Sequence, residues 1–211
     1  MKMNLSGLDI IKSLSCTNVI LASGSPRRSD ILSNLGIKFK IQVSDFEENL
    51  CKEYFKTPKD YVLQTARGKI DSVYAKNSGN NTLIIAADTI VVLGSQILEK
   101  PVSESHALEM LSMLNGQSHS VLTALVVYYK DTQGILKKSE IVEETIVEFG
   151  NNSIDLLQSY VKSLEPMDKA GGYGYQGLGS FLVKSIQGDY YNVVGFPAFA
   201  FLKMLIQIYE L

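Results

Sequence analysis

TLIIAADTIVVL, residues 82–93, is a near-continuous apolar run that only Asp88 and Thr89 interrupt. A run of this length, ended by Gly94-Ser95, predicts a buried β-strand followed by a turn. An ionised carboxylate is costly to bury in such a strand unless it is paired or bound to a metal. Asp88 is therefore either a metal ligand or general base at a cleft, or a strand-end aspartate that is hydrogen-bonded to a turn.

Helix and strand patterns alternate irregularly on both sides of this strand. We expect strands over residues 18–22, 37–44, 119–130, 135–149 and 180–187, and helices over 26–35, 58–76, 104–115, 153–163 and from Pro197 onward. The turn DTQG joins two of these strands into an antiparallel hairpin. The irregular alternation favours an α/β fold, with an elongated mixed sheet and flanking helices, over a doubly wound parallel fold.

Length and charge limit the classes of protein. A chain of 211 residues suits one sizeable domain or two lobes around a single cleft. The formal net charge of −2 and the pI near 5.7 exclude a surface built for nucleic-acid backbones, so an anion site needs a local cluster of cations. No segment has the pattern of a signal peptide or a membrane span. We expect a cytoplasmic protein with neither a nucleic-acid nor a membrane partner.

Two arginines follow a proline at the predicted start of the first helix, in ASGSPRRSDIL (residues 22–32). Ser25 is the expected N-cap and Pro26 the first helical residue. Exposed cations at this end of a helix cost about 0.3–1 kcal/mol each, because the helix dipole favours negative charge there. Arg27 and Arg28 therefore either bind phosphate together with the backbone N–H groups and Ser23, or pair with acidic neighbours such as Asp30.

A glycine-rich stretch, EPMDKAGGYGYQGLGS (residues 165–180), contains the spacing G-x-G-x-x-G. A dinucleotide-binding fingerprint needs a strand before it and a helix after it. Here we expect a helix before the glycines and a strand after them, so the stretch does not match that fingerprint. The glycines instead indicate strained turns or close approach of the backbone to a ligand. Asp168, Lys169 and Gln176 add a carboxylate, a cation and an amide that is able to read a base edge.

Other charged residues are weaker candidates on their own. Lys69 and Lys100 are candidate phosphate cations, although each alone is typical of a protein surface. Glu47 and Glu48 offer carboxylates in a loop, where such pairs are usually solvated.

Taken together, these blocks resemble the Maf family of nucleoside triphosphate pyrophosphatases. The resemblance runs from Val19 to the C-terminal helix and rests on ASGSPRR (22–28), AADT (86–89), LEKP (98–101), NGQSH (115–119), EPMDKAGGYGYQG (165–177) and GDYYNVVGFP (188–197). It implies a fold similar to inosine-triphosphate pyrophosphatases, a homodimer, and cleavage between the α and β phosphates with a divalent metal, Mg²⁺ or Mn²⁺. It implies residues 19–211 as a single Maf-like domain, after an N-terminal extension over 1–18.

The resemblance also implies roles for particular residues. Asp88 matches the family's proposed proton acceptor, and it is also a candidate metal ligand together with Glu48. Arg27, Thr89 and Gln176 match positions linked to substrate choice. The remaining predicted substrate-binding residues are Ser23, Arg28, Lys69, Lys100, Asp168 and Lys169.

The sequence departs from the usual family pattern at three places. Ala87 and Gly172 replace a common glycine and a common alanine, and ARGKI (66–70) keeps Lys69 but not its usual neighbours. The glycine loop resembles the subgroup that acts on dTTP and UTP, which predicts a pyrophosphatase that cleanses the nucleotide pool. The alternatives are a regulatory nucleotide-binding protein in septum and division control, and a pyrophosphatase for 7-methyl-GTP or another purine nucleotide.

Overall fold

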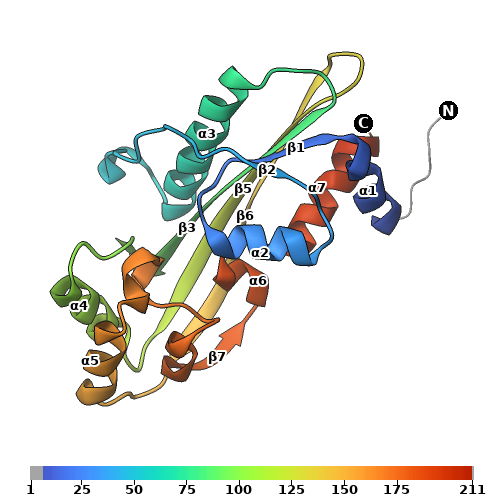
Figure 1. The fold of residues 1–211 in the computed structure, drawn as a ribbon. Helices are drawn as coiled ribbons and strands as arrows, with labels where there is room; N and C mark the ends of the chain where they lie inside the picture. The colour runs from blue at the N-terminus through green and yellow to red at the C-terminus, as the bar shows by residue number, and fades with distance from the viewer. Residues whose placement is uncertain (1–6, 211) are drawn as a thin grey trace. The chain divides into compact units, whose positions relative to one another are not determined.

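A mixed seven-stranded sheet forms the centre of the protein, whose computed structural model describes residues 7–210 (Figure 1). The strands are β1 (Asn18–Leu21), β2 (Lys40–Ile41), β3 (Thr82–Leu93), β4 (Gln96–Leu98), β5 (Ser118–Lys130), β6 (Leu136–Phe149) and β7 (Val183–Gln187). Their order is β2-β1-β3-β5-β6-β7, with β4 paired to β3. β1 pairs in parallel with β2 and β3, whereas the β3–β4 and β6–β7 pairs are antiparallel. The predicted mixed-sheet α/β fold with flanking helices is confirmed.

Helices flank the sheet, and most of them begin next to the residues predicted as their N-caps. They are α1 (Gly7–Ser13), α2 (Pro26–Asn34), α3 (Pro58–Lys76), α4 (Glu104–Leu114), α5 (Ile154–Lys162), α6 (Tyr190–Val194) and α7 (Ala198–Glu210). The start of α3 is a capping box, in which Thr57 accepts from the Asp60 amide and the Asp60 carboxylate accepts from the Thr57 amide. Ser103 and Ser153 cap α4 and α5 by accepting from the amides of His106 and Leu156.

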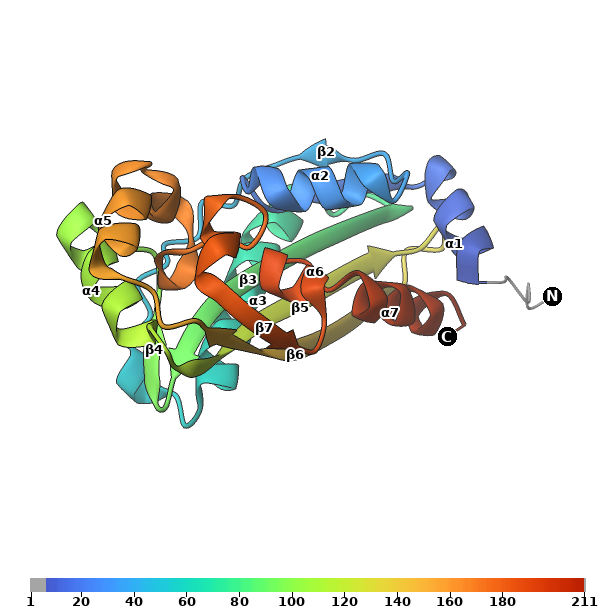
Figure 2. The same cartoon turned by 90° about the horizontal axis from the view of Figure 1, so that it is seen from below.

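The chain divides into two compact units. The first contains residues 7–88, 124–143 and 195–210, and the second contains 89–123 and 144–194. In the first unit α1 and α7 lie side by side, as both views show (Figures 1 and 2). In the second, α4 and α5 pack together over a core that includes Phe149, Leu157 and Tyr173. The strands β3, β5 and β6 contribute residues to both units.

Three predicted elements differ from the structure. The strand expected over 37–44 is only Lys40–Ile41, because it lies at the sheet edge and its expected apolar face is exposed at Ile41 and Val43. Leu35 is exposed rather than part of the buried stripe of α2. The last strand begins at Val183 because the 3₁₀ turn Leu178–Leu182 precedes it. Helices α1 and α6 were not predicted, and residues 1–6 of the expected N-terminal extension lie outside the described residues.

Candidate functional site

The first turn of α2 is not capped by the side chain at its N-cap position. Ser25 occupies the N-cap position with extended backbone and Pro26 follows at the first turn, but the Ser25 side chain makes no capping bond. Instead, the buried Ser23 hydroxyl accepts from the Ser25 amide at 3.2 Å. The Ser25 side chain therefore does not cap this helix start, and a helix N-terminus is a favourable place for an anion.

Arg28 is fixed beside this helix end by two hydrogen bonds. Its Nε donates to the Gly195 carbonyl at 2.9 Å and its Nη1 to the Ser23 hydroxyl at 3.1 Å. Burial lowers the pKa of the Arg28 guanidinium below its ordinary value, while the Asp88 carboxylate opposes this effect and Arg27 adds to it. The guanidinium is therefore a cation held in place by the chain, and the charge of Asp88 acts on it.

Asp88 lies in the interior of β3 and faces a lysine. Lys69 from α3 places its Nζ 2.6 Å from Asp88 Oδ1 and 2.8 Å from Glu48 Oε2. The side chains of Lys69 and Asp88 are each only 12% exposed, whereas that of Glu48 is 50% exposed. The alternative of a strand-end aspartate bonded to a turn is therefore wrong, because a bridging ammonium compensates a mid-strand carboxylate.

The loop that carries Glu48 is anchored on α3 by a glycine. A Cβ added at Gly68 would lie 2.4 Å from Cε2 of Phe46, so only glycine lets this ring rest on the helix. Asp45 binds both Ser72 and Lys76 of the same helix, and these bonds lower the pKa of Asp45 to about 2. The unusual neighbours of Lys69 in ARGKI thus include a residue that positions the Glu48 loop. Sequence reasoning missed this role of Gly68, although its place inside a helix was a signal.

In the second unit, Glu165 organises the glycine loop. Its carboxylate accepts from the Tyr160 hydroxyl at 3.1 Å and from the amides of Leu178 and Gly179 at 2.9 and 3.2 Å. A Cβ added at Gly177 would lie 2.5 Å from Glu165 Oε2. The loop glycines therefore allow close approach to a carboxylate of the chain itself. Sequence reasoning did not single out Glu165.

The predicted polar residues of this loop differ in exposure. Lys169 donates from Nζ to Asp168 Oδ1 at 2.6 Å and to the Glu165 carbonyl at 2.7 Å. Gln176 is exposed, next to Tyr175. Gly171 and Gly172 have φ angles of +68° and +71°, which confirms the strained turns expected there.

Thr89 and Lys100 belong to the second unit as well. The Thr89 and Thr123 hydroxyls lie 3.0 Å apart, and the Thr123 hydroxyl donates to the Asn192 carbonyl at 3.1 Å. Lys100 is exposed just before the buried Pro101.

The structure divides the predicted site residues between the units. Ser23, Arg27, Arg28, Glu48, Lys69 and Asp88 lie in the first unit, and Thr89, Lys100, Asp168, Lys169 and Gln176 lie in the second. Arg28 contacts Ser23, and Lys69 contacts Glu48 and Asp88. The charges of Arg27, Glu48 and Asp88 also act on the pKa of Arg28, and we call this first set the α2–β3 cluster.

Asp88 and Glu48 form the carboxylate pair of this cluster, and both offer oxygens to a divalent cation. Asp88 Oδ1 and Glu48 Oε2 contact one nitrogen, so they are no farther apart than the sum of those two distances. Carboxylate oxygens are ligands of the kind that Mg²⁺ or Mn²⁺ takes. Among residues 7–210, no three acidic, histidine or cysteine side chains gather into a possible metal site. The pair therefore fits a cation only when other ligands supply further oxygens.

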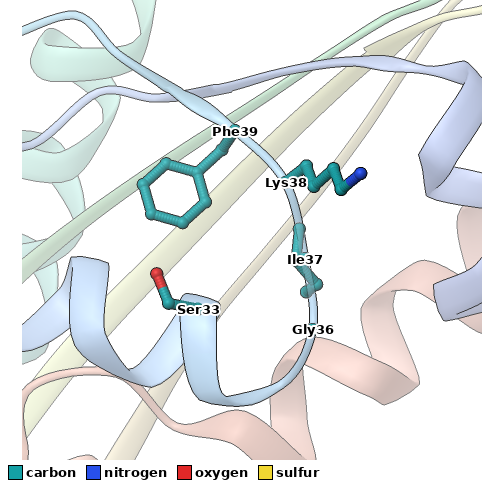
Figure 3. A pocket seen from close by; sticks show the side chains of 5 residues that line it. All are labelled: Ser33, Gly36, Ile37, Lys38 and Phe39. Carbon is teal, nitrogen blue, oxygen red and sulfur yellow. The ribbon is translucent and has the colours of Figure 1, made fainter.

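A surface pocket lies at the other end of α2 and contains none of these residues. It is lined by Ser33, Gly36, Ile37, Lys38 and Phe39 (Figure 3).

None of the helices within residues 7–210 combines the length and the apolar character that a membrane span requires.

These features define a class of α/β protein with a mixed sheet, a helix start that carries two arginines, and a carboxylate pair bridged by a lysine. Residues 18–208 match the family described as Maf-like protein, and the chain belongs to that family.

Named relatives cover most of the chain. It is 47% identical to the human "Probable bifunctional dTTP/UTP pyrophosphatase/methyltransferase protein" over 95% of its own length, and spans 33% of that protein. It is 42% identical to the "dTTP/UTP pyrophosphatase" of Bacillus cereus (strain AH820), over 90% of this chain and 94% of the relative. Among solved structures, a HAM1 protein from Coxiella burnetii matches 64% of this chain and 74% of its own with a TM-score of 0.36 and 16% identity.

Proposed function

We propose that this protein hydrolyses dTTP and UTP to the nucleoside monophosphate and pyrophosphate, and so cleanses the nucleotide pool. The observation that carries the proposal is the α2–β3 cluster, in which Lys69 bridges Asp88 and Glu48 close to the fixed guanidinium of Arg28. The names of the human and Bacillus relatives supply the substrate class.

The cluster has the charge that a triphosphate needs. Arg27, Arg28 and Lys69 bring three cations against the two carboxylates of Asp88 and Glu48. Phosphoanhydride hydrolysis depends on neutralising phosphate charge and on positioning a water in line with the leaving group. We assign triphosphate binding to Ser23, the two arginines and Lys69.

We assign to Asp88 the activation of the attacking water, either as general base or through a cation that it holds with Glu48. A divalent cation, Mg²⁺ or Mn²⁺, would supply charge neutralisation at the phosphates. The buried position of Asp88 and its fixed contact with Lys69 support this role, because a carboxylate held in one place can orient a water.

Recognition of the base is assigned to residues of the second unit and to Arg27. Thr89 and Gln176 are the proposed residues for substrate choice, and Lys100, Asp168 and Lys169 are proposed to bind substrate. An exposed amide such as that of Gln176 offers both a donor and an acceptor to a pyrimidine edge.

The test is pyrophosphate release from a panel of dTTP, UTP, CTP, ATP and 7-methyl-GTP with Mg²⁺ or Mn²⁺. We expect turnover of dTTP and UTP by the wild type and a loss of about a hundredfold or more in Asp88→Asn. Asp30→Asn on the exposed face of α2 is the matched control and should keep wild-type turnover. Binding without turnover of any triphosphate would favour the regulatory alternative, and preference for 7-methyl-GTP would favour the purine alternative.

We further propose that the enzyme is a homodimer in the cytoplasm, as the family resemblance implies. Analytical ultracentrifugation tests the dimer, and a single species at the mass of one chain would contradict it.

A further inference from the structure

Lys69 takes the place that a cation would take between the two carboxylates. Its Nζ contacts Asp88 Oδ1 at 2.6 Å and Glu48 Oε2 at 2.8 Å, and its side chain is only 12% exposed. An ammonium held in this way already neutralises part of the charge that would attract a metal ion.

The surrounding charges oppose a free cation further. Arg28 lies close enough for Asp88 and Glu48 to act on its pKa, and its guanidinium is fixed on Ser23 and Gly195. A divalent ion approaching without a ligand would therefore meet two fixed positive groups.

The number of protein ligands leads to the same conclusion. Mg²⁺ needs six oxygens in near-octahedral geometry, and no third acidic, histidine or cysteine side chain joins the pair among residues 7–210. Phosphate oxygens and waters have to complete the set.

A triphosphate changes each of these conditions. Its negative oxygens offer Lys69 new partners within reach of a long and flexible side chain. Once Lys69 turns to the phosphates, Asp88 and Glu48 lose their compensating ammonium, and a cation already carried by the phosphates can take its place.

We propose that Lys69 closes the carboxylate pair to free divalent cations, so that Asp88 and Glu48 take up a cation only together with the triphosphate. This inference rests on the proposed function and adds an order of binding to it. Lys69 then serves in turn as the partner of the carboxylates and as a partner of the phosphates.

The test measures Mn²⁺ binding to the nucleotide-free protein by electron paramagnetic resonance of the free ion, so it does not depend on turnover. Lys69→Met should bind Mn²⁺ about tenfold or more tightly than the wild type, because a full positive charge next to both carboxylates is removed. Lys69→Gln should show the same gain, and Lys69→Arg should not. Mn²⁺ should also raise the melting temperature of Lys69→Met more than that of the wild type, since an ion that binds the folded state stabilises it.

Two further variants locate the effect. Lys59→Met, an exposed lysine on the same helix, should bind Mn²⁺ as the wild type does. The double variant Lys69→Met with Asp88→Asn should lose the gain. Equal Mn²⁺ affinities of wild type and Lys69→Met, or a gain that survives in the double variant, would overturn the inference. The pyrophosphate assay with wild-type protein tests the proposed function separately, because these affinities are measured without nucleotide.

Discussion

A buried histidine should make the stability of this protein depend on pH between pH 7 and 4. His119 is 3% exposed, and its Nε2 lies 2.7 Å from the Tyr173 hydroxyl. Its ring contacts those of Phe149 and Tyr173 edge-on, with centroids 5.1 and 5.4 Å away. Burial lowers the pKa of His119 to about 4, and the backbone of Gln117 only partly opposes this effect.

The direction follows from proton binding in the two states. In the unfolded chain the imidazole has an ordinary pKa near 6.5, so between pH 6.5 and 4 the unfolded state binds a proton that the folded state does not. The stabilisation is complete above pH 6.5 and decreases as the pH falls. This difference in pKa between the two states lowers the free energy of unfolding by about 2 kcal/mol at pH 5 and about 3 kcal/mol at pH 4, relative to neutral pH.

The assay is urea denaturation at half-unit steps of pH, comparing wild type with His119→Gln. The glutamine amide can still bond the Tyr173 hydroxyl but does not titrate, so the contributions of all other groups cancel in the difference between the two proteins. His106→Gln, which makes the same substitution at the other histidine, is the matched control. Parallel curves for wild type and His119→Gln from pH 7 to 4 would refute the argument.

Three further substitutions test the supports of the site. Gly68→Ala should displace the Phe46 ring and the Glu48 loop with it, and so lower turnover about tenfold or more. The free energy of unfolding of this variant should fall by only about 1 kcal/mol, because the gain in helix propensity offsets part of the overpacking. Glu165→Ala removes the acceptor of three donors and should lower the free energy of unfolding by about 2 kcal/mol in urea denaturation. Arg28→Lys cannot reproduce the fork that binds Ser23 and should raise the KM for dTTP in steady-state assays.

Matched variants make these predictions specific. Gly79→Ala has Thr82 Oγ1 at 3.7 Å as its nearest neighbour and should change neither turnover nor stability. Wild-type turnover in Gly68→Ala would contradict the role of the ring contact, and unchanged stability in Glu165→Ala would contradict the organising role of that carboxylate. An unchanged KM in Arg28→Lys would show that the guanidinium geometry is not used.

The sequence predicted those elements whose signals are local. The apolar run 82–93 is β3 as expected, and Ser25-Pro26 and Thr57-Pro58 begin α2 and α3 as expected. These signals are local because caps and apolar runs act within a few residues of the chain. The strand expected over 37–44 was too long, because alternation alone does not show that an edge strand lacks a buried face.

The sequence singled out charged residues of the α2–β3 cluster but did not reveal their contacts. Arg28 and Asp88 stood out as charges in unsuitable surroundings, which is a property of the sequence alone, whereas Lys69 by itself is typical of a protein surface. Their partners come from distant parts of the chain, since Gly195 binds Arg28 and Glu48 binds Lys69. The supporting roles of Gly68 and Glu165 depend on such long-range packing as well, and no local pattern reveals it.

The most direct test of the central claim is ³¹P nuclear magnetic resonance of dTTP incubated with the protein and Mg²⁺. Cleavage between the α and β phosphates should give equal amounts of the nucleoside monophosphate and pyrophosphate, and Asp88→Asn should give no conversion. Release of orthophosphate with the nucleoside diphosphate, or full conversion by Asp88→Asn, would contradict it.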